Sequence, residues 1–125
     1  MPSPPPLNLT ITATAEHTLL TVAGELDTAT VGRFSARVDE ELHLGPVALI
    51  IDLTGTSFCA ASALRALLRA VARGRATGVH IAIVADHSAV VRPVRALGLS
   101  LPLHRRLPDA LDWLNIVSHL STVVR

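Results

Sequence analysis

The chain has 125 residues, which suits one domain, because a domain of this size buries roughly two-thirds of the surface of its unfolded chain. Half of the residues are hydrophobic but only 2% are aromatic, so the core must consist of aliphatic side chains. A net charge of +1 excludes a strong overall field for nucleic acid or acidic membranes, and a single cysteine excludes an internal disulfide.

Three segments are expected along the chain. Residues 1–6 hold four prolines, which cannot donate to a ladder, and are predicted to form a disordered leader. A single domain is expected over residues 7–120, followed by a C-terminal tail over residues 121–125. The sequence shows neither a secretion signal nor an apolar run long enough to span a bilayer, so we expect a soluble, cytoplasmic protein without membrane insertion.

Two strands are predicted at the start of the domain. Apolar and polar residues alternate over residues 7–13, and a second strand is expected over residues 18–23 after a short turn. We expect these strands to pair as an antiparallel hairpin at one side of the sheet. The motif Gly24-Glu25-Leu26-Asp27 is predicted to end the second strand, and Asp27 to cap the helix that follows.

The centre of the sheet is expected at residues 47–53, which are apolar on both faces except for Asp52. A helix with apolar residues at positions 64, 67, 68 and 71 connects this strand to another over residues 79–84. A strand, a helix and a strand in this order predict a right-handed parallel crossover.

The last third of the domain is predicted to contain a helix over residues 88–97 with Ser88 as its cap. A short strand over residues 101–104 and a final helix that begins near Pro108 follow. The whole order predicts an α/β fold, with a mixed sheet of four to five strands and about four helices packed against it.

The residues that several kinds of active site require are missing from the sequence. It contains neither a glycine-rich phosphate loop nor the Gly-x-Ser-x-Gly motif of a nucleophilic serine. The six histidines show no spacing typical of metal ligands. We therefore expect no enzyme activity, no cofactor and no metal site, and the scarcity of aromatic residues argues against nucleic-acid binding.

The most informative segment runs from Asp52 to Leu64 and reads Asp-Leu-Thr-Gly-Thr-Ser-Phe-Cys-Ala-Ala-Ser-Ala-Leu. We expect a buried strand to end here, a loop of small residues to follow, and a helix to begin at Ala61 or Ser62. The N–H groups at such a helix start lack partners within the helix, and small side chains allow another protein to approach closely. Small residues also suit a tight strand-to-helix turn, so both interpretations stay open.

This segment resembles the signature of the STAS family, the anti-sigma factor antagonists, which reads Asp-Leu-Ser-x-Val-x-Phe-apolar-Asp-Ser-Ser-Gly-Leu. The positions that fit are Asp52, Leu53, Thr54, Ser57, Phe58, Ser62 and Leu64. Gly24-Glu25-Leu26-Asp27 matches a second mark of the family, Gly-Glu-Leu-Asp, and residues 88–99 resemble its third helix. The resemblance covers about residues 7–120 and implies a single STAS domain.

The resemblance implies a protein that binds an anti-sigma factor, often a serine-kinase ATPase, and so frees a sigma factor for transcription. In the family, the kinase reverses this by phosphorylating the first serine of Asp-Ser-Ser-Gly, because the added charge disfavours the interface. Ala61 occupies that position here, so the usual phospho-switch cannot operate there. A constitutive antagonist controlled by its abundance, phosphorylation of Ser62 or, failing that, Ser57 or Thr56, and a relative with another partner all stay open.

We expect the partner-binding surface to contain Glu25, Asp27, Thr56, Ser57, Cys59, Ala60, Ala61, Ser62, Arg65 and Arg69. Some of these have a second, structural interpretation. Asp27 and Ser62 suit helix caps, and Arg65 and Arg69 suit an ordinary solvated helix face. Cys59 suits a buried, inert thiol, whereas a redox switch would need an exposed thiol of lowered pKa.

The alternative function is that of a STAS subunit that regulates a membrane transport assembly in trans, since STAS domains also serve in transporters. The sequence leaves the oligomeric state open.

Overall fold

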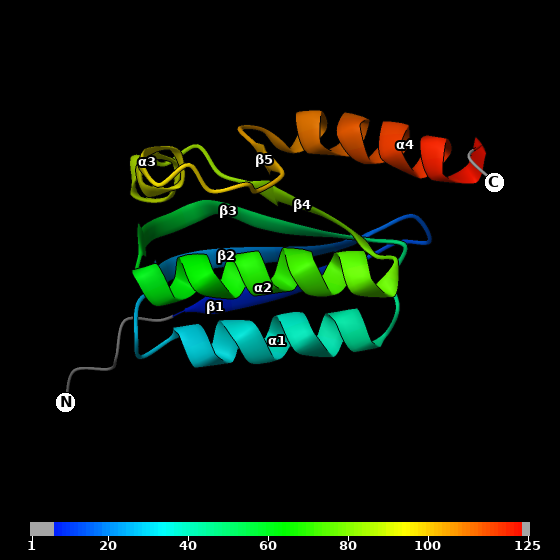
Figure 1. Ribbon diagram of the computed structural model, residues 1–125. Helices are drawn as coiled ribbons and strands as arrows, with labels where there is room; N and C mark the ends of the chain where they lie inside the picture. Colours follow the sequence, from blue (N-terminus) through cyan, green and yellow to red (C-terminus); the bar gives the residue numbers. More distant parts are fainter. Residues whose placement is uncertain (1–6, 124–125) are drawn as a thin grey trace.

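The predicted hairpin is present and lies at one edge of the sheet (Figure 1). The computed structural model describes residues 7–123, so the leader predicted over residues 1–6 and the last two residues of the predicted tail lie outside the described residues. Within residues 7–123, five strands form one sheet in the order β1-β2-β3-β4-β5. β1 pairs antiparallel with β2, and every other neighbouring pair is parallel. The predicted α/β fold with a mixed sheet is therefore confirmed.

The strands follow the chain order across the sheet. Their bounds are β1 Asn8–Ala13, β2 Thr18–Leu26, β3 Ala48–Cys59, β4 His80–Val84 and β5 Leu103–His104. The bounds of the four helices in the described part of the chain are α1 Val31–His43, α2 Ala61–Thr77, α3 Ser88–Ala96 and α4 Leu107–Val123. α4 thus extends three residues beyond the domain end predicted at residue 120.

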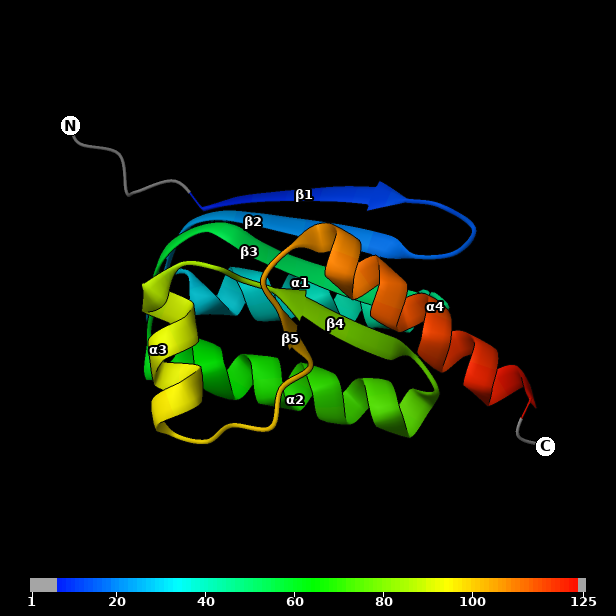
Figure 2. The same cartoon turned by 90° about the horizontal axis from the view of Figure 1, so that it is seen from above.

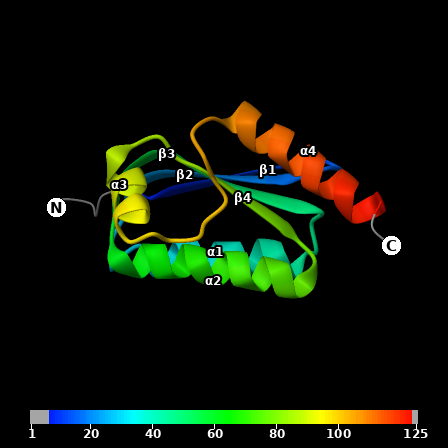
Figure 3. The same cartoon turned by 45° about the horizontal axis from the view of Figure 1, so that its top comes forward.

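The helices lie on both faces of the sheet (Figures 2 and 3). α1 and α2 run side by side across one face, and α4 crosses part of the opposite face (Figure 1). α3 lies across the end of the sheet at which β3 ends (Figure 2). This end therefore brings together the last residues of β2 and β3 and the first residues of α2.

Successive side chains along each strand point to opposite faces of the sheet, so the sheet contributes to two cores, one on each face. The larger core lies between the sheet and α1 and α2 and includes Leu20, Val22, Leu49, Ile51, Leu53, Phe34, Val38, Leu64 and Leu67. The smaller core packs Ala48, Ile50, Ala82 and Val84 of the sheet against Ala110 and Leu114 of α4. Ile50 and Ile51 of β3 are both fully buried, as predicted for a central strand.

β2 and β3 are longer than predicted. The expectation that Gly24-Glu25-Leu26-Asp27 ends the second strand is wrong, and so is the expectation that the third strand gives way to a loop before residue 60. The two extensions pair with each other, and their hydrogen bonds satisfy backbone groups in both segments. Patterns within either segment alone do not reveal this pairing. Glycines suit this region: Gly24 has a φ of 119°, and a Cβ on Gly55 would lie 3.2 Å from that of Ala23.

Two helix caps also differ from prediction. α1 begins at Val31 rather than directly after Asp27, whose carboxylate instead accepts hydrogen bonds in the turn before the helix. α3 is capped by His87, because its Nδ1 accepts a hydrogen bond of 3.0 Å from the N–H of Ala89. Ser88, the predicted cap, is the first helical residue, so its hydroxyl is one position too late for that role.

Candidate partner-binding surface

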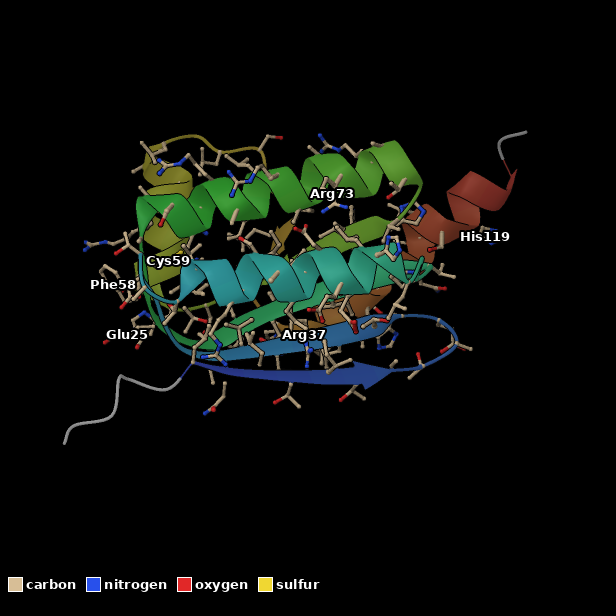
Figure 4. All side chains as sticks on the ribbon, turned by 90° about the horizontal axis from the view of Figure 1, so that it is seen from below. Glu25, Arg37, Phe58, Cys59, Arg73 and His119 are labelled. Atoms are coloured by element: carbon tan, nitrogen blue, oxygen red, sulfur yellow. The ribbon has the colours of Figure 1, made fainter. Side chains whose placement is uncertain are left out.

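The predicted site residues gather where β2 and β3 end and α2 begins. Figure 4 shows Glu25, Phe58 and Cys59 at this end of the molecule. Glu25 and Phe58 are register partners on β2 and β3, and both are exposed. We call the exposed or half-buried residues Glu25, Ser57, Phe58, Ala60 and Ala61 the Phe58 surface.

Phe58 was not among the residues expected to form the binding surface. It is 48% exposed, although Phe34, the only other phenylalanine, is fully buried. A large aromatic side chain at the surface is uncommon in a chain with so few aromatics, and aromatic residues are enriched at protein interfaces. Phe58 is one of the positions that match the motif, so the sequence pointed to this residue. Its exposure, however, could be known only once the course of β3 was known.

The backbone positions the small residues of this surface. The N–H of Ala60 donates to the carbonyl oxygen of Leu26 at 2.8 Å, which closes β3 against β2 after its last paired residue. Ala60 has extended dihedral angles and precedes the first turn of α2, whose Leu64 N–H donates to the Ala60 carbonyl oxygen at 3.2 Å. The predicted helix start is therefore confirmed, and Ala61 presents its methyl group to solvent there.

Ser62 follows Ala61 but differs from it in environment. The side-chain oxygen of Ser62 is buried and has no hydrogen-bond partner within the described part of the chain. The prediction that Ser62 caps α2 is therefore wrong. Ala60 occupies the N-cap position, and no side chain at this described helix start accepts a capping hydrogen bond. A buried hydroxyl is also out of reach of a modifying enzyme in this conformation.

Thr56 lies inside the sheet rather than on its surface. The residue is fully buried, and its hydroxyl donates to the carbonyl oxygen of Val22 at 3.2 Å. This hydrogen bond joins β2 and β3 beside the register shift between them. The burial contradicts the prediction that Thr56 contacts a partner, whereas its neighbour Ser57 is exposed.

Cys59 is half-buried at the end of β3. Burial raises the pKa of its thiol to about 11, because the interior disfavours the charged thiolate. A protonated thiol at neutral pH is a poor nucleophile, so the interpretation of Cys59 as a redox switch of lowered pKa is wrong. The Cys59 side chain packs against the larger core instead.

Asp27 borders the surface and holds its edge in place. Its carboxylate accepts hydrogen bonds from the N–H groups of Ala29 and Thr30, at 2.9 and 3.0 Å. The Thr30 hydroxyl in turn donates to the carbonyl oxygen of Glu25 at 2.6 Å. Asp27 therefore has a structural role, and this turn fixes the backbone of Glu25.

The four arginines of α2, Arg65, Arg69, Arg73 and Arg75, are all exposed, but their neighbours differ. Arg65 and Arg69 are exposed, and Arg65 lies one turn after Ala61, close to the Phe58 surface. Arg73 forms an ion pair with Asp39 of α1 and so links the two helices. Arg69 lies between these two places, beside a shallow groove of about 190 Å³ that separates α1 and α2.

Other types of site find no support in the residues that the structure describes. Residues 7–123 contain no group of three or more histidine, cysteine, aspartate or glutamate residues arranged to hold a metal ion. In the same range, no helix combines the length and the apolar character needed to cross a membrane.

Comparisons with known proteins agree on one family. The family model described as the STAS domain matches residues 8–110. The anti-sigma-F factor antagonist RsfB of Mycobacterium tuberculosis is 31% identical over 111 residues, which cover 85% of this chain and 89% of that protein.

Solved structures show the same similarity. An anti-sigma factor antagonist from Mycobacterium paratuberculosis is 26% identical with a TM-score of 0.81, and the match covers 88% of this chain and 95% of the other. The anti-sigma factor antagonist SpoIIAA in its unphosphorylated form shares the fold, with 18% identity and a TM-score of 0.72 over 88% of this chain and 96% of that one.

Proposed function

This chain belongs to the STAS domain family, and from that membership we propose that it is an anti-sigma factor antagonist, which binds an anti-sigma factor and so frees a sigma factor for transcription. The protein acts by binding rather than by catalysis, without a cofactor, and works in the cytoplasm, where sigma factors act. The single observation that carries this proposal is the 31% identity, over most of both chains, to a protein named as such an antagonist.

The Phe58 surface provides a suitable means of binding. Phe58 holds about half of its ring surface in water, and transferring that apolar area into a partner's pocket favours association. Ala60 and Ala61 add little bulk, so the partner's backbone can come close to the start of α2. The free N–H groups of the first helical turn favour an acidic or carbonyl group of the partner at that place.

The alanine at position 61 determines how such an antagonist is controlled. An alanine has no hydroxyl, and the hydroxyls of Ser62 and Thr56 are buried, so three of the four candidate acceptor positions cannot be phosphorylated in the folded protein. Among these four positions, Ser57 alone is both exposed and hydroxyl-bearing. We propose that the antagonist is constitutive and that its abundance sets the amount of free sigma factor.

A reconstituted release assay tests the function. Complexes of each anti-sigma factor of the source organism with its sigma factor are purified and titrated with this protein, and free sigma factor is measured by size-exclusion chromatography. We expect release from one complex, and we expect A61D to abolish release because it buries a charge in the interface.

The matched control is A72D, which adds the same charge at an exposed position three turns further along α2 and leaves release intact. Failure to bind any of the anti-sigma factors contradicts the proposal. Binding to a transporter subunit in the same assay format favours the alternative role in a membrane transport assembly.

A further inference from the structure

Among residues 7–123, no backbone group pairs with the outer edge of β1. β1 is the first strand in the sheet order, so β2 pairs with one of its edges only. The Thr14 N–H donates to the carbonyl oxygen of His17 at 2.8 Å and closes the hairpin as a hydrogen-bonded pair. Such pairs alternate with non-bonded pairs along an antiparallel ladder, so the N–H and C=O groups of Leu9, Ile11 and Ala13 point away from β2.

This edge lacks the features that usually protect an edge strand from pairing. β1 contains neither a charged residue nor a proline, and its register with β2 is continuous from Asn8 to Ala13. Leu9 and Ile11 pack partly against the larger core, while Thr10 and Thr12 are exposed on the other face. The four prolines among residues 1–6 have no N–H with which to continue a ladder.

We propose that β1 pairs antiparallel with β1 of a second copy of this chain, about a two-fold axis at Ile11, so that two sheets join into one. In this register Ile11 of each copy pairs with Ile11 of the other, and Leu9 pairs with Ala13. The three outward N–H groups and three outward carbonyls of each copy then form six hydrogen bonds. Thr10 of one copy faces Thr12 of the other, and threonine pairs of this kind stabilise sheets.

Charge on the neighbouring helix favours a second copy over an unrelated strand. α1 packs on one face of the sheet and runs in the same direction as β1 (Figure 1). Arg33, Arg37 and Glu40 of α1 surround a hollow beside Leu9, at the edge of the sheet. Because a two-fold axis reverses direction, the start of one α1, with Arg33, faces the end of the other, with Glu40, whose carboxylate also pairs with Arg37 of its own helix at 3.4 Å.

The paired edge shares no residue with the Phe58 surface, which lies at the ends of β2 and β3. Each dimer therefore presents two separate binding surfaces. This inference does not depend on the proposed function, because self-association is measured on the protein alone.

Sedimentation velocity of the full chain over a concentration series tests the inference. We expect a species of twice the 13.2 kDa chain mass. The variant A13P removes one outward N–H from each copy at an exposed position, and residue 13 donates no hydrogen bond to β2. We expect its self-association to be at least about tenfold weaker.

Two matched charge variants provide the control for register. T10K/T12K places lysine opposite lysine across the proposed junction and is expected to give monomers. T10E/T12K places glutamate opposite lysine and is expected to remain dimeric, with both variants checked for folding by circular dichroism. A wild-type monomer at millimolar concentration overturns the inference, and so does a dimer that forms equally well in both double variants.

Discussion

Glu25 and Phe58 face each other across β2 and β3, one position before each strand ends, and both side chains are exposed. The next register pair, Leu26 with Cys59, turns inward, so the change from surface to core takes place within a single residue. The Phe58 surface is thus the exposed end of the same strands that form the centre of the core.

Replacing Phe58 with alanine is expected to affect binding more than stability. The ring is half in water, so F58A should lower the free energy of unfolding by less than about 1 kcal/mol. Loss of an aromatic anchor should weaken affinity for the anti-sigma factor by about tenfold or more. Isothermal titration and urea denaturation measure the two effects, and the contrasting variant F34A, in the core, should cost about 3–5 kcal/mol of stability. Unchanged affinity in F58A argues that the partner binds elsewhere.

Removing the Ser62 hydroxyl is expected to leave stability unchanged or to raise it. The oxygen is buried without a hydrogen-bond partner in the described part of the chain, and such a group costs about 1–3 kcal/mol. S62A should therefore leave the free energy of unfolding, measured by urea denaturation, unchanged or increase it. A loss of about 0.5–2 kcal/mol is the result expected of a helix cap, and it would contradict the present assignment.

The hydroxyl of Thr56 is expected to stabilise the junction of β2 and β3. T56V keeps the shape of the side chain but leaves the Val22 carbonyl without this donor, so we expect a loss of about 1–2 kcal/mol in the free energy of unfolding. The same substitution at Thr28, which is exposed in the turn before α1, serves as the control and should change stability by less than about 0.5 kcal/mol. Equal effects at the two positions count against a specific role for Thr56.

Stability should fall in alkaline solution because of Cys59. Burial raises the pKa of this thiol from 9.0 to about 11, so the unfolded chain loses the proton first. The stabilising contribution is complete below pH 9 and is lost as pH rises to about 11, by at most about 2–3 kcal/mol. The chain contains neither lysine nor tyrosine, so no other type of side chain has its ordinary pKa in this window.

Urea denaturation of the wild type and of C59A from pH 8 to pH 11 measures this effect. We expect a falling free energy of unfolding for the wild type and a nearly level one for C59A. Parallel curves for the two proteins contradict a buried, protonated thiol.

Local pattern was enough to predict part of this fold. The alternation over residues 7–13, the run of apolar residues 47–53 and the helical spacing after Ala61 identify β1, the centre of β3 and α2, because each element buries its own face in a regular period. The hairpin could also be predicted, since its two strands are neighbours in sequence.

The ends of β2 and β3 could not be predicted in the same way. Gly24 and Gly55 are poor strand residues, and they belong to strands only because segments about thirty residues apart pair with each other. This long-range pairing also decides that Thr56 is buried and that Phe58 is exposed. For the same reason, a motif could indicate the region of the proposed binding surface but not which of its side chains are exposed.

The twelve residues of β3 run without a break from the centre of the molecule to the Phe58 surface. A binding surface carried on a hydrogen-bonded strand is rigid before the partner arrives, so little conformational entropy is lost when the complex forms. Such a surface docks with little change of shape, in contrast to a loop that must first become ordered. The length of this one strand therefore makes the proposed binding surface a preorganised template for a partner.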